Sequence, residues 1–465
     1  MKIKTASRPG SDTHIGFVLK GDMKNAIKDF EAEKDTITVR YKGKRTVIYC
    51  GLGERTECTS RTIRAAAAAG IKKAAELKRK AVSVLDTPVD CRSDACARAA
   101  IEGALLGAYS FSKYKSKKPA AVTGIEFVTK EISSQEANDI FRLCRAAWYT
   151  RDLVNDNASV TTPEHLAAEA RAIAADKSVS VEILDERAIR KKGLGLLWAV
   201  GKGSPYPPRL ALMEYKGDPS SKRKIAVVGK GITFDSGGQN LKPSGHIETM
   251  RCDMAGAAAV LGLMRALTSL KPKLNVVGVI TCAHNAVGSN AYFPGDVYTS
   301  YAGTNVEITN TDAEGRLALA DAFAYVQKHY RPSHVIDLAT LTGSVVMALG
   351  DTVAGLFANS DALAQSLYHA GEKTGERLWR LPLYEEHSES MKSDHADLRN
   401  TSKLKRGYAG SITAAAFLKE FVGKKVSWAH IDIAGTAFNE GEARGEVPKY
   451  GTGFGVRLLW EYLTA

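Results

Sequence analysis

The stretch from Lys230 to Arg316 constrains this chain more than any other, because it sets many charged groups among glycines and apolar runs. It opens with the glycine-rich segment 227–238 and closes with the octapeptide Asn-Thr-Asp-Ala-Glu-Gly-Arg-Leu at 310–317. Its notable charged residues are four carboxylates, two lysines and an arginine: Asp235, Asp253, Asp312, Glu314, Lys230, Lys242 and Arg316. Such groups are rarely buried without a partner that offsets the loss of their hydration. The stretch therefore predicts a fold that gathers carboxylates around divalent cations.

Length and composition predict a cytoplasmic enzyme of two domains. At 465 residues the chain is too long for one typical hydrophobic core, and its 44% hydrophobic content is that of a soluble globular protein. It has no run of about 18 apolar residues, and residues 1–12 lack the apolar core of a secretory signal, so we expect neither a membrane span nor export. The seven cysteines are widely spread without a Cys-x-x-Cys pair, which is typical of free thiols in a reducing compartment.

Nearly all of the net charge of +13 lies in the first 130 residues. They carry 26 lysines and arginines against 14 acidic residues, whereas the other 335 residues carry 38 against 37. A basic region of this kind either contacts an anionic partner or only keeps the surface soluble. The clearest candidates for a nucleic-acid contact are the lysines around Tyr114, namely Lys113, Lys115, Lys117 and Lys118. DNA therefore stays open as an alternative partner.

Residues 1–130 alternate between strand and helix patterns, which predicts an α/β domain with a mostly parallel sheet. Thr59 or Ser60 is the expected N-cap of a helix that contains five successive alanines and ends near Arg79. Asp94 is the expected cap of a second helix, which ends near Tyr109. Strands are expected at 36–41, 46–50, 81–85 and 121–128.

Apolar residues recur at helical spacing between Ser134 and Val154, which predicts a linking helix within 131–160 and a second α/β domain over 161–465. Thr162-Pro163 marks a helix start. Strands are expected at 179–184, 196–200, 210–215, 225–228, 274–282, 306–309 and 335–341, and helices at 253–270 and 314–329. The carboxylates thus fall at strand ends and helix starts, where open α/β sheets bind their ligands.

The spacing of the carboxylates suits two divalent ions. Ions about 3.5–4 Å apart need a carboxylate that bridges them, and Asp312 and Glu314 stand together at one strand-to-helix turn. Asp235 and Asp253 approach from other elements, and four carboxylates roughly balance two divalent ions. Lys230 is expected to shift toward its neutral amine, which can bind a metal. None of the ten histidines falls among these residues, so the ligand set favours Mn, Mg or Zn.

Each of these residues also has an ordinary structural explanation. Asp312 and Glu314 fit a favourable interaction with a helix dipole. Lys242 and Arg316 fit exposed surface cations. The Gly-Lys-Gly at 229–231 is compatible with a phosphate-binding loop but lacks the Gly-x-x-x-x-Gly-Lys-Ser/Thr spacing. Only the occurrence of all these residues together favours a metal centre.

At these residues the chain resembles the leucyl aminopeptidase family, cytosolic two-metal exopeptidases that include bacterial aminopeptidase A. The octapeptide at 310–317 matches the signature of that family throughout. The spacings back to four residues also agree with the family pattern: Lys230, Asp235, Lys242 and Asp253. The similarity extends from about Arg151 to Phe454 and includes Leu338–Gly343, Ala409–Ala415 and His430–Gly435, whereas residues 1–130 agree only in style and length.

The resemblance implies a macro-like N-terminal α/β domain and a phosphorylase/hydrolase-like catalytic domain, assembled as a homohexamer that releases leucine and other apolar N-terminal residues from peptides. The implied ligands of one metal are Asp235, Asp312 and Glu314, and those of the tighter metal are Lys230, Asp235, Asp253 and Glu314. Lys242 is implied to polarise the scissile carbonyl. Arg316 is implied to hold a bicarbonate ion that acts as the general base. A free substrate α-amine can itself ligate a metal, which would explain a requirement for an unblocked N-terminus.

The implied side-chain pocket departs from the family at one position. Its residues are Met250, Thr340, Gly343, Ala434 and Ala437. Ala437 stands where many members carry methionine, which widens the expected pocket and weakens a strict preference for leucine.

Overall fold

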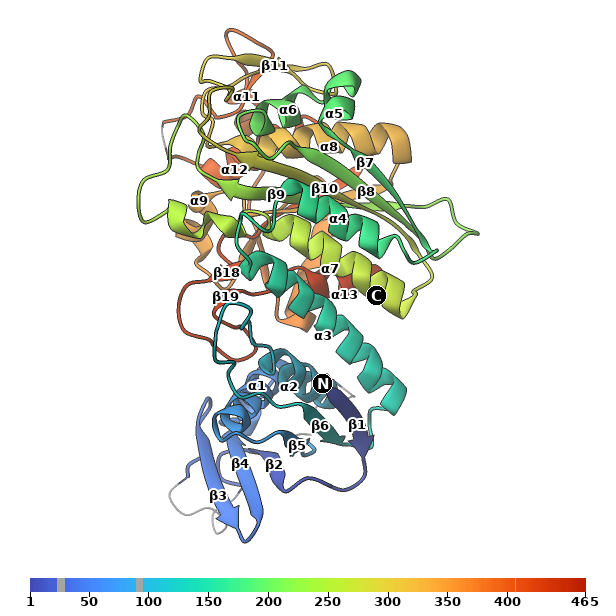
Figure 1. Ribbon diagram of the computed structural model, residues 1–465, viewed down its shortest axis with the longest axis vertical. Helices are drawn as coiled ribbons and strands as arrows, with labels where there is room; N and C mark the ends of the chain where they lie inside the picture. Colours follow the sequence, from blue (N-terminus) through green and yellow to red (C-terminus); the bar gives the residue numbers. More distant parts are fainter. Residues whose placement is uncertain (23–29, 89–94, 406) are drawn as a thin grey trace. The chain divides into compact units, whose positions relative to one another are not determined.

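The computed structural model describes residues 1–465 apart from 23–29, 89–94 and 406, and it divides into two compact units (Figure 1). Unit 1 comprises Met1–Trp148 and Asn439–Lys449, and unit 2 comprises Tyr149–Phe438 and Tyr450–Ala465. Both units combine a β-sheet with helices, which confirms the predicted two-domain α/β fold.

In the described part of unit 1, the strands form a sheet in the order β1-β6-β5-β2-β4-β3. Neighbouring strands run parallel, except that β3 and β4 form an antiparallel hairpin. The bounds are β1 (Lys2–Ala6), β2 (Thr13–Val18), β3 (Ile37–Lys42), β4 (Arg45–Gly51), β5 (Ala81–Val84) and β6 (Gly124–Val128). The strands expected from the sequence of this unit are therefore confirmed.

Helices α1 (Ser60–Glu76) and α2 (Ala95–Gly107) of unit 1 pack against each other, and the short η1 (Arg55–Glu57) precedes them. The hydroxyl of Thr59 accepts a hydrogen bond from the first turn of α1 at 3.4 Å, as expected for the N-cap. A Cβ atom on Gly103 of α2 would lie 2.1 Å from the backbone oxygen of Arg64 on α1, so the two helix backbones approach closely. The predicted cap of the second helix, Asp94, lies outside the described residues.

Helix α3 (Ser134–Asn155) falls within the expected linking segment 131–160, and the chain passes from unit 1 to unit 2 inside it. The domain bounds expected at 130 and 160 stay a prediction.

The main sheet of unit 2 has the order β15-β14-β17-β13-β9-β10-β8-β7 over the residues that the structure covers. Its centre, β17-β13-β9-β10, is parallel, whereas β14 is antiparallel to β17 and β8 is antiparallel to β10. The bounds are β7 (Val179–Leu184), β8 (Arg209–Lys216), β9 (Ile225–Asp235), β10 (Asn275–Asn285), β13 (His334–Ala339), β14 (Ala354–Ala358), β15 (Leu378–Arg380) and β17 (Ser427–Asp432). Shorter strands are β11 (Val297–Thr299), β12 (Asn305–Glu307), β16 (Leu398–Arg399), β18 (Phe438–Asn439) and β19 (Tyr450–Gly451).

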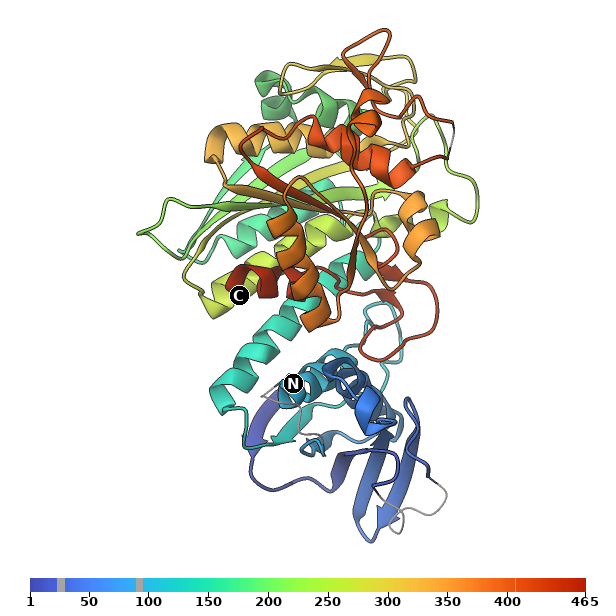
Figure 2. The same cartoon turned by 180° about the vertical axis from the view of Figure 1, so that it is seen from behind.

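Helices cover both faces of this sheet (Figure 2). One face carries α4 (Pro163–Ile173), α7 (Ala255–Leu270) and α10 (Asp361–Thr374), with α13 (Val456–Thr464) packed on α7 and α10. The other carries α6 (Gly195–Gly201), α8 (Glu314–Tyr330) and α12 (Gly410–Lys419). The remaining helices are α5 (Glu186–Lys192), η2 (Ile247–Cys252), α9 (Gly343–Leu349) and α11 (Glu385–Glu389).

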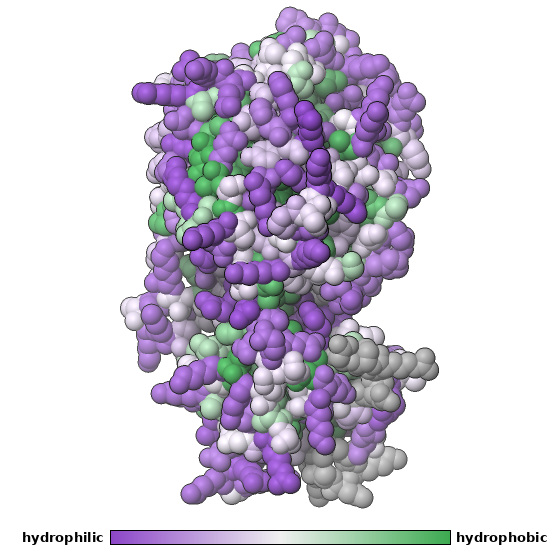
Figure 3. Space-filling view, turned by 90° about the vertical axis from the view of Figure 1, so that its right-hand side faces the viewer, coloured by the Kyte–Doolittle hydropathy of each residue, from purple (hydrophilic) through white to green (hydrophobic). Residues whose placement is uncertain are grey.

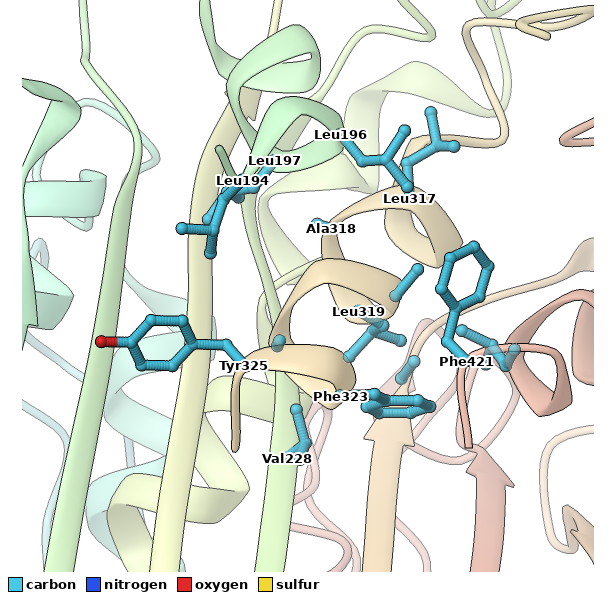
Figure 4. Close-up of a cluster of buried hydrophobic side chains, with 14 of the residues drawn as sticks. Leu194, Leu196, Leu197, Val228, Leu317, Ala318, Leu319, Phe323, Tyr325 and Phe421 are labelled. Atoms are coloured by element: carbon cyan, nitrogen blue, oxygen red, sulfur yellow. The ribbon is translucent and has the colours of Figure 1, made fainter. Parts of the chain in front are cut away.

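Figure 4 shows the core that holds α8 in place. Leu317 and Phe323 of α8 belong to the same buried cluster as Leu196 of α6 and Val228 of β9, and all four side chains are fully buried. Burial of a large apolar side chain stabilises a fold by about 1.5–3 kcal/mol. This packing fixes the start of α8, and with it the direction of Glu314.

One predicted strand in unit 2 is wrong. Residues 196–200 form helix α6, because a short run that is apolar on every side has no period that separates strand from helix. The carboxylate of Asp321 accepts hydrogen bonds from the backbone nitrogens of Leu196 and Leu197, both at 2.9 Å, and thereby caps this helix. In unit 1, α1 ends at Glu76 rather than near Arg79, because Lys78 adopts a left-handed φ of 57°.

The cysteine prediction also needs correction. Cys96 is disulfide-bonded, contrary to the expectation of free thiols, and Cys91 lies outside the described residues. In the described part of the chain, five cysteines form no disulfide: Cys50, Cys58, Cys144, Cys252 and Cys282.

The segment Ile247–Leu270 has the length and apolar composition of a membrane span, but 78% of its apolar window is buried inside the protein. It consists of η2 and the core helix α7, so burial within unit 2 accounts for its composition.

Figure 3 shows hydrophilic side chains over most of the face that it draws, with apolar side chains in scattered groups.

Candidate metal centre

Three carboxylates meet at the carboxyl edge of the main sheet. Asp235 is the last residue of the central strand β9, Glu314 is the first residue of α8, and Asp312 lies just before it. One oxygen of each lies within 4.8 Å of the others. The structure therefore brings together residues that are up to 79 positions apart in the sequence. Asp253 reaches the same region from the turn between η2 and α7.

Lys230 lies in the middle of this group and is 2% exposed. Its Nζ lies 2.7 Å from Asp253 Oδ2 and 2.9 Å from Glu314 Oε1, and it donates to the backbone oxygen of Thr340 at 2.8 Å. Burial alone lowers the pKa of Lys230, but the carboxylates of Asp253, Glu314 and Asp235 outweigh it and raise that pKa above its ordinary value. In this arrangement the Lys230 amine is protonated. The neutral amine expected from the sequence would form only if further positive charge, such as a metal ion, offset the carboxylates around it.

Lys242 holds the other side of the cluster. Its Nζ lies 2.8 Å from Asp235 Oδ2 and 2.6 Å from Asp312 Oδ1. The pKa of Lys242 is raised, because the carboxylates outweigh its burial. Its side chain keeps 15% exposure, against 3% for Lys230, so Lys242 is the more accessible of the two lysines.

The residues of this cluster fit divalent ions. Among the described residues, Glu314 Oε2 is buried without a hydrogen-bond donor. Burial, together with the like charges of Asp235 and Glu314, raises the pKa of Asp312 to about 7. Burial also raises the pKa of Asp253 well above its ordinary value. Burial thus favours the protonated form of these carboxyl groups. A bound divalent cation favours the ionised form, and hard cations of this kind prefer oxygen ligands.

Backbone geometry and an asparagine orient Asp235. Its Oδ1 accepts hydrogen bonds from Gly237 N at 2.9 Å and from Asn285 Nδ2 at 2.8 Å. Gly237 has a φ of +85°, and a Cβ there would lie 2.4 Å from the backbone oxygen of Asn240, so only glycine fits. Asn285 also donates to the backbone oxygen of Thr311 at 3.0 Å and so ties the end of β10 to the loop before α8. Sequence reasoning missed Asn285.

A second asparagine that the sequence analysis missed, Asn400, anchors the loop that carries Asp312. Asn400 is fully buried, and its Oδ1 accepts hydrogen bonds from the backbone nitrogens of Thr309 at 2.8 Å and Asn310 at 3.2 Å. Its Nδ2 donates to Asn310 O at 2.6 Å. Asn400 stands 88 positions after Asp312, and no local pattern marks it.

Arg316 is the third residue of α8, within its first turn, and is 8% exposed. Its Nη1 donates to the backbone oxygen of Asn400 at 2.8 Å, whereas its Nε is buried without a hydrogen-bond partner among the described residues. Burial lowers the pKa of Arg316 to about 10 although nearby carboxylates oppose the shift. A buried guanidinium with an unused N–H fits a small oxyanion.

Asp432 brings together two turns that carry predicted pocket residues. Its Oδ1 accepts hydrogen bonds from Leu341 N at 3.0 Å, in the turn after β13, and from Ala434 N at 3.2 Å, in the turn after β17. In the first of these turns, the Thr340 hydroxyl also donates to Asp253 Oδ1 at 2.7 Å. Met250 belongs to η2, three residues before Asp253, and Gly343 is exposed at the start of α9. Ala437 is 2% exposed, and that its small side chain widens a pocket stays a prediction.

Comparison with known proteins decides the family. The family model described as the cytosol aminopeptidase family, catalytic domain, matches residues 148–460, and the model of its N-terminal domain matches residues 24–118. The chain belongs to the cytosol aminopeptidase family. It is therefore a metal-dependent aminopeptidase that acts on peptides, which confirms the activity and enzyme class expected from the sequence.

Individual members of the family are similar over nearly the whole chain. A probable cytosol aminopeptidase of Protochlamydia amoebophila is 42% identical over 447 residues, 94% of this chain and 89% of that protein. A probable cytosol aminopeptidase of Geobacter sulfurreducens is 44% identical over 434 residues, 90% of this chain and 85% of that protein. The solved structure of the bottromycin maturation enzyme BotP in complex with Mn is 35% identical with a TM-score of 0.90, over 98% of this chain and 99% of that chain. A mutant of tomato leucine aminopeptidase is 31% identical with a TM-score of 0.89, over 100% and 96%.

Proposed function

We propose that this cytosol aminopeptidase binds two divalent ions, Mn or Zn, in the cluster around Lys230. In this proposal, the side chains that would hold the ions are those of Lys230, Asp235, Asp253, Asp312 and Glu314. The observation that carries it is the meeting of three carboxylates within 4.8 Å, one of which has a buried oxygen without a donor. BotP in complex with Mn makes Mn the first ion to test. When bound, two such ions supply a water of lowered pKa as the nucleophile and positive charge for the developing oxyanion.

Lys242 is the residue that we propose to meet the scissile carbonyl. Its ammonium holds Asp235 and Asp312 at the partly exposed edge of the cluster, and it can turn from these carboxylates to a substrate oxygen as negative charge develops there. A preorganised donor in this role contributes about 3–4 kcal/mol to transition-state stabilisation. The proposal assigns Lys242 to transition-state binding rather than to substrate affinity.

Arg316 is proposed to hold a bicarbonate ion, since its buried Nε has no partner among the described residues. Bicarbonate, when bound, supplies a general base. The side chains of Met250, Thr340, Gly343, Ala434 and Ala437 are proposed to form the side-chain pocket. The turns after β13 and β17 share Asp432 as their acceptor, which supports a common wall there.

Location in the cytoplasm and assembly as a homohexamer are further parts of the proposal. The names of the relatives support the first. Large apolar side chains at the surface support the second, since Met347 is 90% exposed and Trp379 is 57% exposed. Light scattering of the purified protein measures the oligomeric state.

A second candidate function is DNA binding by unit 1, whose lysine-rich loop is its specific support. Lys115, Lys117 and Lys118 are exposed, and Tyr114 is 53% exposed beside them. Phosphate contacts by lysine weaken steeply as salt rises. A fluorescence titration of a DNA duplex at 50 and 200 mM salt tests this function, and equal affinity at both concentrations would contradict it.

The aminopeptidase mechanism is tested with metal-stripped protein and leucine p-nitroanilide. We expect hydrolysis to return when Mn or Zn is added, and only for the substrate with a free α-amine, because that amine is proposed to approach the ions. The N-acetylated substrate is the control. Hydrolysis by the stripped protein, or of the acetylated substrate at the same rate, would contradict the proposed centre.

A further inference from the structure

A cavity of about 490 Å³ adjoins the proposed reacting centre on the side of Arg316. Asn310 and Arg316 line one part of it, and Asn310 Oδ1 accepts a hydrogen bond from Asp312 N at 2.8 Å, so this part lies directly beside the metal cluster. Leu404, Lys405 and Tyr408 line another part. The volume lies within the ~300–1,000 Å³ that is typical of small-ligand pockets, which suits a short peptide.

Charge distinguishes this cavity. The side chains that line it in the described part of the chain include two cations, Arg316 and Lys405, and no carboxylate. Among the described residues, the contact of the Lys405 ammonium is with an aromatic ring and not with a carboxylate: its Nζ lies 5.5 Å from the centroid of the exposed Tyr408 ring. Lys403, two residues earlier in the same loop, is instead paired with Asp394. The cavity therefore favours a ligand that brings its own negative charge.

A larger cavity of about 850 Å³ lies at the opposite edge of the main sheet, where β9, β13 and β17 begin, and it lacks this selectivity. Its basic side chains are accompanied by acidic ones. Lys373 pairs with Glu461 at 2.6 Å, and Asp218 lines the same cavity as Lys273. Among the described residues, a lining that contains cations and no carboxylate is thus a feature of the cavity beside the metal cluster and not of this larger one.

We propose that Lys405 binds the C-terminal α-carboxylate of short peptide substrates, so that the enzyme favours short peptides with a free C-terminus. The inference rests on the proposed function, since it places the reacting bond at the metal cluster. A peptide whose first residue is held there extends its remaining residues along the cavity. Its terminal carboxylate is the negative charge that every unmodified short peptide carries. When the peptide binds, the Lys405 ammonium exchanges its weak contact with the Tyr408 ring for an ion pair with the peptide carboxylate.

The test compares Leu-Gly-Gly with its C-terminal amide on the Mn-loaded enzyme. Because Lys405 is exposed, we expect kcat/KM for the acid to exceed that for the amide by about fivefold, and the difference to shrink as salt rises. Lys405→Gln removes most of this ratio, whereas Lys403→Gln, the matched loss of one lysine from the same loop, leaves it in place. Hydrolysis of leucine p-nitroanilide by each variant checks that the metal centre is formed.

Each outcome has one meaning. An acid-to-amide ratio near one in the unaltered enzyme, or equal ratios in both lysine variants, overturns the proposal while hydrolysis itself continues. The C-terminal amide of Leu-Glu-Gly carries a negative charge only on its glutamate side chain. If Lys405→Gln lowers kcat/KM for this amide as much as it lowers kcat/KM for the free acid, the cavity recognises an acidic side chain instead, which also overturns the proposal. Loss of all hydrolysis in the unaltered, Mn-loaded protein is a failure of the proposed metal centre and not of the cavity.

Discussion

Replacement of Asn400 by alanine tests whether one buried side chain holds the Asp312 loop. Its amide makes three close contacts with the backbone of this loop, at 2.8 and 3.2 Å as acceptor and at 2.6 Å as donor. A hydrogen bond contributes about 1 kcal/mol net, and the groups left behind remain buried. Asn400→Ala should therefore lower the free energy of unfolding of unit 2 by about 3 kcal/mol.

The same substitution should reduce catalysis in molecules that remain folded. A displacement of about 1 Å of a catalytic group can lower the rate about a hundredfold. Without Asn400, nothing else described here accepts from Thr309 N or Asn310 N at the start of this loop, and Arg316 loses the fixed position of its backbone acceptor. We expect kcat/KM for leucine p-nitroanilide to fall by about that factor. Urea unfolding and steady-state kinetics on the Mn-loaded protein measure both effects.

Asn275→Ala is the matched control. Asn275 is 7% exposed and makes similar bonds at the amino end of β10, donating to Asp218 O at 2.8 Å and Ser221 O at 2.9 Å and accepting from Asp218 N at 3.1 Å. It should destabilise unit 2 by a similar amount and leave kcat/KM unchanged, because it lies at the edge of the sheet away from the carboxylates. Equal kcat/KM in the two variants would refute the argument that Asn400 positions Asp312.

Three further predictions rest on contacts of single residues. A Cβ on Gly315 would lie 2.4 Å from Lys230 Cε, so Gly315→Ala should displace this lysine and weaken Mn binding, as measured by calorimetry, without unfolding the protein. Lys242→Ala should lower kcat far more than it raises KM, and the reverse pattern would assign Lys242 to ground-state binding. Burial acts to raise the pKa of Glu126, but a lysine ammonium and hydrogen bonds from Ser83 and Gly10 lower it to about 2. This group therefore stabilises unit 1 above its ordinary pKa of about 4.3, and the stabilisation is lost as pH falls toward 2. Acid titration of unfolding should show a weaker dependence in Glu126→Gln, and identical curves would contradict the assignment.

The sequence predicts the position of the carboxylates well because local rules fix it. Asp235 ends an apolar strand and Glu314 begins an amphipathic helix, and both boundaries are visible in the sequence. Neighbouring parallel strands end at the same edge, so residues at their ends meet. Asn285 follows the same rule, because it is the polar residue that ends the apolar strand β10 beside β9. Its place near Asp235 could therefore have been predicted from the sequence.

The parts that the sequence did not reveal depend on contacts between distant segments. Asn400 comes from a loop that reaches Asp312 only in the folded chain, and neither a period nor a turn pattern marks it. Residues 196–200 form a helix because Asp321, more than 120 positions later, caps them. A run of five apolar residues looks the same in the sequence whether it forms a buried strand or a buried helix. Tertiary contacts decide such segments.

The two lysines explain how the carboxylates can meet at all. Two like charges about 4 Å apart repel by about 4 kcal/mol in a medium of intermediate polarity, and the cluster contains several such pairs. Lys230 and Lys242 each place an ammonium group within 2.9 Å of two carboxylates, and they take different pairs: Asp253 and Glu314 for one, Asp235 and Asp312 for the other. Four carboxylates thus share two ammonium groups, so full ionisation of all four requires further positive charge, which a divalent ion supplies. Folding itself therefore brings the ligands together, so ion binding need not overcome the full repulsion among them.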